Sequence, residues 1–408
     1  MPDELDVWLY GLRVAVVDKV RGRPHLAYTV EAQERYAPGT PLLSIALPVR
    51  AERYPQGIVG TYLDGLLPEG EARRTIARDF NLGPNDTYGL IRALGRDCAG
   101  AVVIQPAEEP APPPPTTLSA EPLTDETVAE LVTNLRSAPL GAGGRVRISL
   151  AGVQEKLLLT RMPDGRWGRP VDGTPSTHIL KPEMAAYPDS VANEAFCMRI
   201  ARHLGLEVAS VDTTEVEGRK LIVVERYDRS VSADGAVKRI HQEDFCQAAT
   251  AAPDLKYEED GGPSLSRIAS IVQAVASPDS LERLLRHVTV NALVGNGDGH
   301  AKNFSLLHEE SGRLSLAPAY DVMSTLVYGD DHLALYVDNV RRTNRVNAER
   351  IVNEAASWGM PVGRAAELVD DILARAREAI DASRSETPDL PEAVVDVVKG
   401  QLRQMRGS

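Results

Sequence analysis

The stretch Gly295–Asn303, GNGDGHAKN, places an aspartate, a histidine, a lysine and an asparagine among glycines. It follows residues 280–294, where leucine and valine recur at helical spacing, and its first glycine is suited to end that helix. Two short apolar runs, 303–308 and 313–318, come next, and the polar letters EESG between them are typical of a β-hairpin. Asp321 follows the second run. The sequence therefore predicts a helix, a polar loop, a hairpin and an aspartate, in this order.

This order matches the arrangement of a protein-kinase active site. A kinase catalytic loop carries an aspartate and an asparagine with the spacing of Asp298 and Asn303, and a second, metal-binding aspartate follows a hairpin. We interpret Asp298 as the base that takes the hydroxyl proton, and Asn303 and Asp321 as oxygen ligands of Mg²⁺. His300 is placed to contact phosphate or to orient Asp298, and Lys302 to reach the γ-phosphate. The glycines are expected to let the backbone pass close to phosphates and metal.

A kinase also needs a lysine on a strand of its N-terminal lobe. Lys181 ends the β-rich run STHILK and is the candidate for the α- and β-phosphates of ATP. Glu194 is the acidic residue within the next predicted helix, residues 189–205, and is its candidate partner. The helix dipole favours acidic residues near the start of a helix, and this explains Glu194 equally well. The role of Glu194 therefore stays open.

The remaining nucleotide contacts are expected on both sides of Lys181. The run SLAGVQEK, which begins at Ser149, precedes it and is the candidate phosphate cradle, with a glycine cluster at 141–144 upstream. Its residues are Ala151, Gly152, Val153, Gln154, Glu155 and Lys156. A backbone hinge for the adenine is expected after the next strand, at Glu225, Arg226 and Tyr227.

Composition limits the classes of function. The chain has 408 residues, of which 43% are hydrophobic, and a formal charge of −13, so as a whole it repels nucleic acid and anionic membranes. Its three cysteines lack the CxxC spacing of a zinc site and are expected to fill the core. No apolar run reaches the roughly 18 residues that a membrane span needs. We expect a soluble, cytoplasmic protein.

The chain divides at residues 106–117, where six prolines in twelve positions predict an extended linker. Residues 1–105 are expected to form a β-rich N-terminal subdomain, including a strand-like run at 41–49. Residues 118–227 and 228–408 are expected to form a kinase N-lobe and a helical C-lobe. The predicted fold class is α+β, a bilobal protein-kinase-like fold.

Several runs together resemble the HipA family, the serine/threonine kinase toxins of bacterial toxin–antitoxin pairs. They are RISLAGVQEK, STHILK, VERYDR, KYEEDGGP and GDGHAKNFSL followed by YDV, and in the N-terminal subdomain PLLSIALP, LDGLLPEG and LGRDCAGAV. The resemblance covers nearly the whole chain. It implies a protein kinase that uses ATP and Mg²⁺, and autophosphorylation at Ser149 that displaces the phosphate loop and inactivates the enzyme.

The resemblance also implies partners. These are a helix-turn-helix antitoxin of the HipB type, through which the kinase reaches operator DNA, and a target among the aminoacyl-tRNA synthetases. Two other functions stay open at the level of sequence. One is a kinase for a small molecule or a lipid, because lipid kinases share the D-x-H-x-x-N core. The other is a catalytically silent co-repressor that binds its antitoxin.

Overall fold

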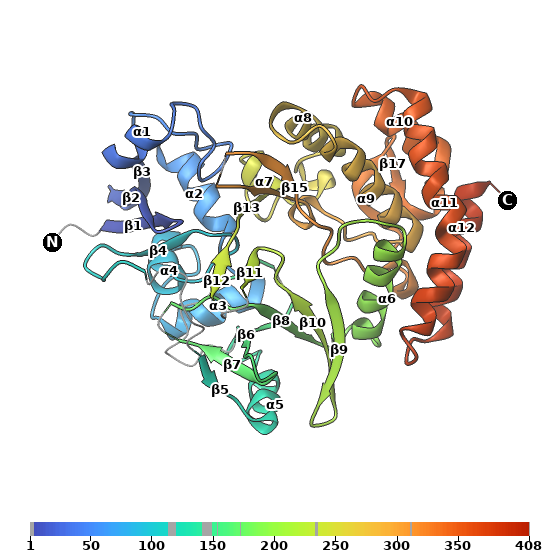
Figure 1. Cartoon of the computed structure of the whole chain (residues 1–408), viewed down its shortest axis with the longest axis horizontal. Coiled ribbons are helices and arrows are strands. Elements are labelled where there is room, and N and C mark those ends of the chain that lie inside the picture. The colour runs from blue at the N-terminus through green and yellow to red at the C-terminus, as the bar shows by residue number, and fades with distance from the viewer. Residues whose placement is uncertain are drawn as a thin grey trace.

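The computed structural model describes residues 4–112, 120–140, 149–152, 154–171, 173–232, 236–310 and 312–407. Part of the predicted linker, the glycine cluster at 141–144 and Val153 lie outside these ranges. An N-terminal unit lies at one end of the molecule and the C-terminal helices, which belong to the proposed C-lobe, lie at the other (Figure 1).

The N-terminal unit is built on an antiparallel four-stranded sheet in the order β3-β2-β1-β4. Its strands are β1 (Glu4–Leu9), β2 (Leu12–Val20), β3 (Arg23–Tyr28) and β4 (Val103–Pro106). Its helices are α1 (Val30–Arg35), α2 (Gln56–Gly65), α3 (Gly70–Asp79) and α4 (Thr87–Leu94). A hydrophobic core of its own joins the sheet and the helices, so the unit can fold around its own apolar residues.

The predicted strand at 41–49 is wrong. Its leucines are buried, but its backbone is irregular. The Ser44 hydroxyl and the Ile45 amide instead donate hydrogen bonds to the Glu243 carboxylate, at 2.5 and 2.9 Å. In a strand, backbone polar groups pair with a neighbouring strand. Here a side chain about two hundred positions away accepts these hydrogen bonds in place of such a strand.

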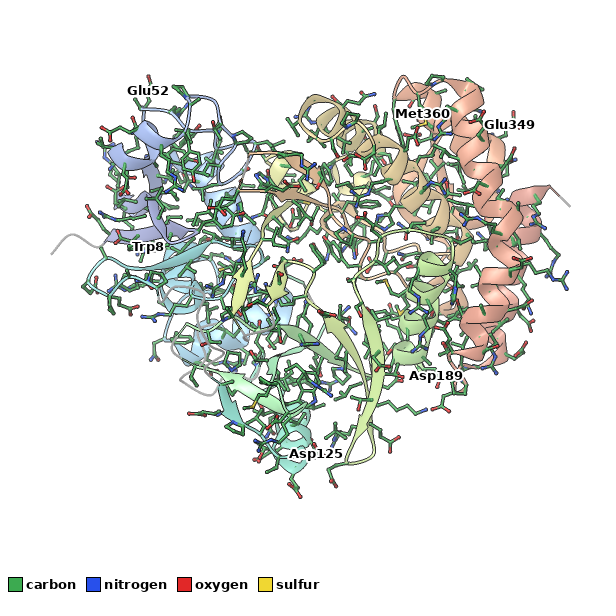
Figure 2. All side chains as sticks on the ribbon, viewed as in Figure 1. Trp8, Glu52, Asp125, Asp189, Glu349 and Met360 are labelled. Atoms are coloured by element: carbon green, nitrogen blue, oxygen red, sulfur yellow. The ribbon has the colours of Figure 1, made fainter. Side chains whose placement is uncertain are left out.

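A six-stranded sheet in the order β5-β7-β6-β8-β10-β9 forms the second layer. Its strands are β5 (Ala120–Pro122), β6 (Leu157–Arg161), β7 (Trp167–Pro170), β8 (His178–Pro182), β9 (Val211–Val216) and β10 (Arg219–Glu225). Two helices accompany it, α5 (Asp125–Thr133) and α6 (Ser190–His203). Figure 2 places Asp125 and Asp189 at the starts of these helices. Helix α6 packs against α9 and α11, so it belongs as much to the helical part as to the sheet.

The helical part confirms the predicted order around the polar loop. Helix α9 spans Ser280–Val294 and ends at Gly295 in the left-handed region, with φ 68°. Strands β14 (Ser305–His308) and β15 (Leu314–Leu316) form the expected antiparallel hairpin, which β13 (His241–Asp244) extends to three strands. Two short strand pairs complete it, β11 (Arg229–Val231) with β12 (Val237–Arg239), and β16 (His332–Val337) with β17 (Val340–Arg342).

The other helices are α7 (Phe245–Ala248), α8 (Leu265–Val275), α10 (Ala348–Ser357), α11 (Val362–Ser385) and α12 (Glu392–Arg406). Four short 3-10 turns accompany them, at Glu258–Asp260, Ala301–Asn303, Leu326–Tyr328 and Thr343–Arg345. None of the helices in the described ranges is long and apolar enough to cross a membrane.

A buried charged cluster joins the N-terminal unit to the end of β10. Asp97 accepts hydrogen bonds from Ser176 and from the guanidinium of Arg229, the latter at 2.8 Å. Arg226 lies 3.5 Å from Asp97 and 2.9 Å from Asp228. Burial alone would raise the pKa of Asp97, but the arginines hold it below its ordinary value. The cluster therefore keeps ionised groups of two units in one dry interface.

Removing the Asp97 charge is expected to destabilise the protein strongly. Asp97→Asn leaves buried arginines short of a counter-charge, a loss of about 3–5 kcal/mol. The measurement is the shift in the midpoint of urea denaturation.

Glu282→Gln is the matched control, because its ion pair with Arg364 is exposed and such pairs contribute about 1 kcal/mol or less. Equal shifts for the two variants would contradict a structural role of the buried cluster.

Candidate active site

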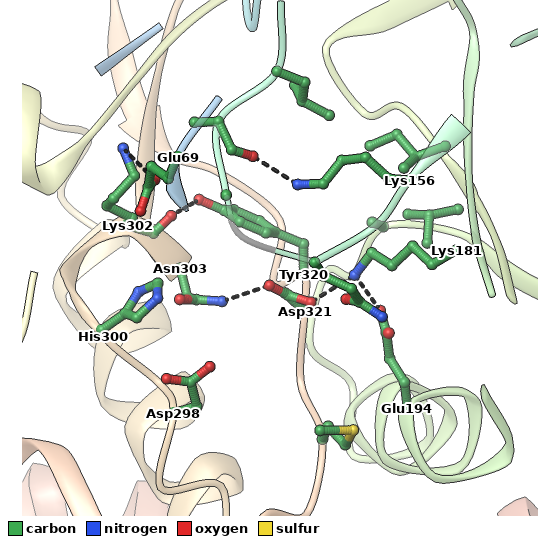
Figure 3. Close-up of a pocket in the computed structure, with 18 of the residues that line it drawn as sticks. Glu69, Lys156, Lys181, Glu194, Asp298, His300, Lys302, Asn303, Tyr320 and Asp321 are labelled. Atoms are coloured by element: carbon green, nitrogen blue, oxygen red, sulfur yellow. Dashed lines mark hydrogen bonds and ion pairs between the residues drawn. The ribbon is translucent and has the colours of Figure 1, made fainter. Parts of the chain in front are cut away.

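A cavity of about 730 Å³ lies between the six-stranded sheet and the hairpin β14–β15. This volume is typical of small-molecule and cofactor sites. Among its lining residues are Glu69, Lys156, Lys181, Glu194, Tyr227, Asp298, His300, Lys302, Asn303 and Asp321 (Figure 3). Segments that are far apart in the sequence thus meet around one space.

Lys181 lines this space and pairs with two of its acidic residues. Its ammonium lies 2.8 Å from Glu194 Oε1 and 2.6 Å from Asp321 Oδ1. Burial would lower the pKa of Lys181, but the two carboxylates raise it above its ordinary value. The contact with Glu194 that the sequence left open is present in the structure.

Asp321 links this lysine to the polar loop. Its backbone has φ 58°, a left-handed conformation that is uncommon for a non-glycine residue. Its second carboxylate oxygen accepts a hydrogen bond from Asn303 Nδ2 at 3.0 Å. Asn303 Oδ1 is buried and accepts no hydrogen bond from the described residues, whereas the Asp321 side chain is still 46% exposed. Asn303 Oδ1 and the Asp321 carboxylate are hard oxygens of the kind that bind Mg²⁺, although Asn303 here turns its amide nitrogen toward Asp321.

Asp298 lies on the same loop and its side chain is exposed to the cavity. Its carboxylate Oδ1 accepts a hydrogen bond from the Tyr257 hydroxyl at 2.7 Å. The surrounding protein displaces water and raises the pKa of Asp298 above its ordinary value, while the bond from Tyr257 acts in the opposite direction.

The glycines of the loop are packed closely against other parts of the protein. A Cβ on Gly297 would lie 2.3 Å from the carbonyl oxygen of His332, and one on Gly299 would lie 3.2 Å from the Asn291 side chain. The Gly297 amide donates to Thr325 Oγ1 at 2.8 Å. Close packing against the His332 carbonyl therefore requires a glycine at position 297. The expected approach of the loop backbone to phosphate and metal stays a prediction.

His300 is buried beside Asn303 and Asp298 (Figure 3). Its ring packs edge-on against Tyr257, with 5.3 Å between centroids, and Nδ1 has no hydrogen-bond partner in the described parts of the chain. Burial and nearby Lys256 lower the pKa of His300 to about 3. The imidazole is therefore neutral and has a nitrogen left to meet a ligand.

Lys302 also lines the cavity. Its ammonium is buried, lies 2.8 Å from Asp244 and is 3.7 Å from Glu69 of the N-terminal unit. Burial would lower the pKa of Lys302, but these carboxylates hold it above its ordinary value. Two acidic residues already pair with Lys302, one of them from the N-terminal unit, so its ammonium also joins the two units. Its contact with a γ-phosphate stays a prediction.

The described part of the predicted phosphate cradle lines the cavity with Ala151, Gly152, Gln154, Glu155 and Lys156. The Lys156 ammonium donates to the Ala151 carbonyl at 2.7 Å. Burial and the neighbouring Lys181 lower the pKa of Lys156 to about 8. Glu155 pairs with exposed Arg136 at 2.7 Å, and its contact with the nucleotide stays a prediction. Among the described lysines that line the cavity, Lys156 has no carboxylate within ion-pair distance, whereas Lys181, Lys256 and Lys302 do.

The three residues of the predicted hinge differ in what their polar groups and rings contact. The amides of Glu225 and Arg226 already donate to the carbonyls of Ser210 and Thr177, and the Arg226 guanidinium lies in the buried cluster with Asp97. Tyr227 lines the cavity, and its ring lies 5.4 Å from that of Tyr320. The Tyr227 ring is therefore the hinge group that is best placed to pack against a bound base.

Ser149 is fully buried at the start of the cradle. Its hydroxyl donates to the Leu66 carbonyl at 2.5 Å, and its amide donates to the Asp97 carbonyl at 2.9 Å. Both acceptors belong to the N-terminal unit. Ser149 thus marks the point at which that unit holds the phosphate cradle.

Sequence reasoning missed two residues of this site. Glu69 stands in LDGLLPEG, which suggested only a family resemblance, yet it lies within 3.4 Å of Lys256 and donates its amide to Gly152. Tyr257 stands in KYEEDGGP, and that motif was given no role. The close glycine pair after Tyr257 was the available signal, since it predicts a tight turn that could present a side chain.

Comparisons with known proteins now identify the family. Family models for the HipA-like C-terminal domain and the HipA N-terminal domain match residues 148–380 and 5–105. The chain belongs to the HipA family.

Similar proteins of this family carry kinase names. The chain is 36% identical to a protein of Sinorhizobium fredii called putative kinase Y4mE, over 85% of this chain and 84% of that protein. It is 32% identical to the serine/threonine-protein kinase toxin HipA of Shewanella oneidensis, over 74% of this chain and 72% of that protein. This HipA-family chain is a kinase.

A solved structure shows the same fold. The Shewanella oneidensis HipA in a complex with HipB and operator DNA matches with a TM-score of 0.84 and 27% identity, covering 99% of this chain and 96% of that one. The α+β, bilobal kinase-like fold predicted from the sequence is therefore confirmed, together with its HipA-type N-terminal unit.

The affinity of the cavity for ATP is expected to depend on pH through Lys156. Its pKa of about 8 means that it is charged below this pH and neutral above it, while bound phosphates favour the charged form. The dissociation constant of a non-hydrolysable ATP analogue with Mg²⁺ is expected to rise by up to about tenfold from about pH 8 to about pH 9. Calorimetric titration measures it.

Lys156→Met should bind the analogue more weakly and lose this rise, whereas exposed Lys220→Met should behave as the unchanged protein. A rise of the same size in Lys156→Met would contradict the assignment.

Proposed function

We propose that this HipA-family kinase transfers the γ-phosphoryl group of ATP, with Mg²⁺, to serine or threonine hydroxyls of proteins. One observation carries the proposal. Asp321 lies between Lys181 and Asn303, with Asp298 on the same wall of one cavity (Figure 3). Phosphoryl transfer depends chiefly on such positioning and charge neutralisation.

The oxygens present fit Mg²⁺ together with a nucleotide. In the described ranges no group of three or more His, Cys, Asp or Glu residues is arranged to hold a metal alone. Mg²⁺ commonly binds through one or two protein oxygens plus substrate phosphates, and Asn303 Oδ1 and Asp321 would supply these protein oxygens. When bound, the metal would neutralise charge on the phosphates.

The other side chains would share the remaining work. Lys181, held by Glu194, would bind the α- and β-phosphates, and Lys156 would meet phosphate from the cradle. Asp298 would accept the proton of the attacking hydroxyl as its oxygen bonds to phosphorus and the bond to ADP breaks. Neutral His300 would donate or accept a hydrogen bond beside the transferred group.

Removal of either acidic group should abolish transfer. Asp298→Asn removes the proton acceptor and Asp321→Ala removes a metal ligand, so each is expected to reduce phosphoryl transfer by about a hundredfold or more. Radiolabelled ATP, Mg²⁺ and a bacterial extract provide the assay, in which protein kinases label protein bands.

Asp396→Asn, on the exposed face of α12, is the control for a change of charge alone. Full labelling by Asp298→Asn would refute the proposed function. Labelling of lipid or small molecules in place of protein would refute the protein substrate.

We also propose that Ser149 is autophosphorylated and that this switches the kinase off. Ser149 is buried against Leu66 and Asp97, so the segment must leave the N-terminal unit before its hydroxyl can react. A phosphate adds about −1.5 to −2 charges at neutral pH. The Ser149 side chain is fully buried, so a phosphate on it would not fit at its present position. The modified segment therefore cannot return to hold ATP.

Preincubation tests this switch. The unchanged protein, preincubated with ATP and Mg²⁺, is expected to lose activity as phosphate accumulates, and Ser149→Ala to keep its activity. Ser137→Ala, at an exposed serine, should lose activity like the unchanged protein. Phosphopeptide mapping that found the mark elsewhere would contradict the switch without affecting the kinase proposal.

The biological partners follow from the same family. We propose a small helix-turn-helix antitoxin of the HipB type, an action on growth through an aminoacyl-tRNA synthetase, and a cytoplasmic location. The support is the similar Shewanella oneidensis complex of HipA, HipB and operator DNA. A net charge of −13 opposes direct DNA binding, so the antitoxin would make the DNA contact. Co-purification with the product of a neighbouring gene tests this.

A further inference from the structure

Lys256 and Tyr257, in the loop of residues 255–262, line the cavity, and the proposed mechanism gives this loop no task. We propose that Tyr257 of this loop is a positioning residue that fixes the carboxylate of Asp298. The inference rests on the proposed function, because it concerns the acceptor side of the same reaction.

The contact itself is short and specific. The Tyr257 hydroxyl donates to Asp298 Oδ1 at 2.7 Å. Asp298 Oδ2 accepts no hydrogen bond from other described residues, and the Asp298 amide donates to Asn296 Oδ1 at 3.1 Å. A carboxylate turns about a single bond, so a hydrogen bond to one oxygen sets the direction of the other. Oδ2 is thereby left to face the incoming hydroxyl.

The tyrosine ring is held on the catalytic loop itself. It packs edge-on against His300, and the carbonyl of Lys256 accepts a hydrogen bond from the Ala301 amide at 3.2 Å. The two loops are therefore joined by backbone as well as by side chains. A phenol with these contacts moves with Asp298 rather than independently of it.

The far side of the loop is also fixed. Glu258 accepts a hydrogen bond from the Tyr336 amide at 2.8 Å, and the Lys256 ammonium lies 3.4 Å from Glu69. A Cβ at Gly262 would lie 2.1 Å from the Leu255 carbonyl, so this turn requires glycine. Anchors of this kind distinguish a support from a lid, because a lid must swing away from the site.

The chemistry gives the support a purpose. During transfer the acceptor oxygen bonds to the γ-phosphorus, the bond from phosphorus to the ADP oxygen breaks, and the acceptor proton passes to Asp298 Oδ2. Tyr257 keeps its own proton throughout. Because proton acceptance needs alignment with the attacking hydroxyl, a base that is free to rotate slows this step without affecting ATP binding.

Tyr257→Phe tests the inference, since it keeps the ring and removes only the hydroxyl. The expected result is a fall in kcat of about tenfold to a hundredfold, with unchanged KM for ATP and unchanged thermal midpoint. Tyr336→Phe is the matched control, because its hydroxyl is buried without a hydrogen-bond partner in the described residues. It should keep the kcat of the unchanged protein.

A double variant separates support from other effects. If Tyr257 acts through Asp298, adding Tyr257→Phe to Asp298→Asn should cause no further loss. An unchanged kcat in Tyr257→Phe would overturn the inference, and so would a raised kcat, which would show that the phenol blocks the acceptor. A parallel loss of ATP affinity or of thermal stability would also overturn it. Full activity of Asp298→Asn alone would instead refute the proposed function.

Discussion

One buried ammonium determines how the parts of this molecule must fit together. Lys181 comes from the centre of the six-stranded sheet, Glu194 from α6 and Asp321 from the segment after the hairpin. Each charge is costly to bury without the others, so strand, helix and hairpin have to converge within hydrogen-bond distance. Helix α6 packs on the C-terminal helices, and this packing transmits their position to the lysine. The two lobes are thus aligned by charge as well as by apolar contact.

The N-terminal unit also helps to position the active-site residues. Leu66 and Asp97 hold Ser149 at the start of the phosphate cradle. Glu69, which lines the cavity, reaches Lys256 and Lys302. The same unit therefore touches the phosphate cradle, the catalytic loop and the loop of Tyr257. A kinase lobe without it would present the same residues in a looser arrangement.

The sequence predicts well what is local. Helix α9, its glycine end and the hairpin before Asp321 follow from periodicity and turn chemistry, because each depends on neighbours within a few positions. The pairing of Glu69 with Lys302 joins residues that are 233 positions apart, and no periodicity encodes it. The same reason explains the wrong strand at 41–49, where a distant carboxylate replaced a neighbouring strand. The catalytic roles of the site residues stay predictions.

The cluster of Asp97 with Arg226 bears on how such a protein can change over generations. Arg226 belongs to the segment proposed to meet the adenine, and it pairs with Asp228 of its own unit and also with Asp97 of a different unit. A recombination event that exchanged the N-terminal unit for an unrelated one would remove the Asp97 carboxylate. Buried guanidinium groups near the proposed nucleotide site would then lack part of their counter-charge. We therefore expect the two units to be inherited as a pair. New substrate specificity would then arise on their outer surfaces, while the buried charged cluster between them stays the same.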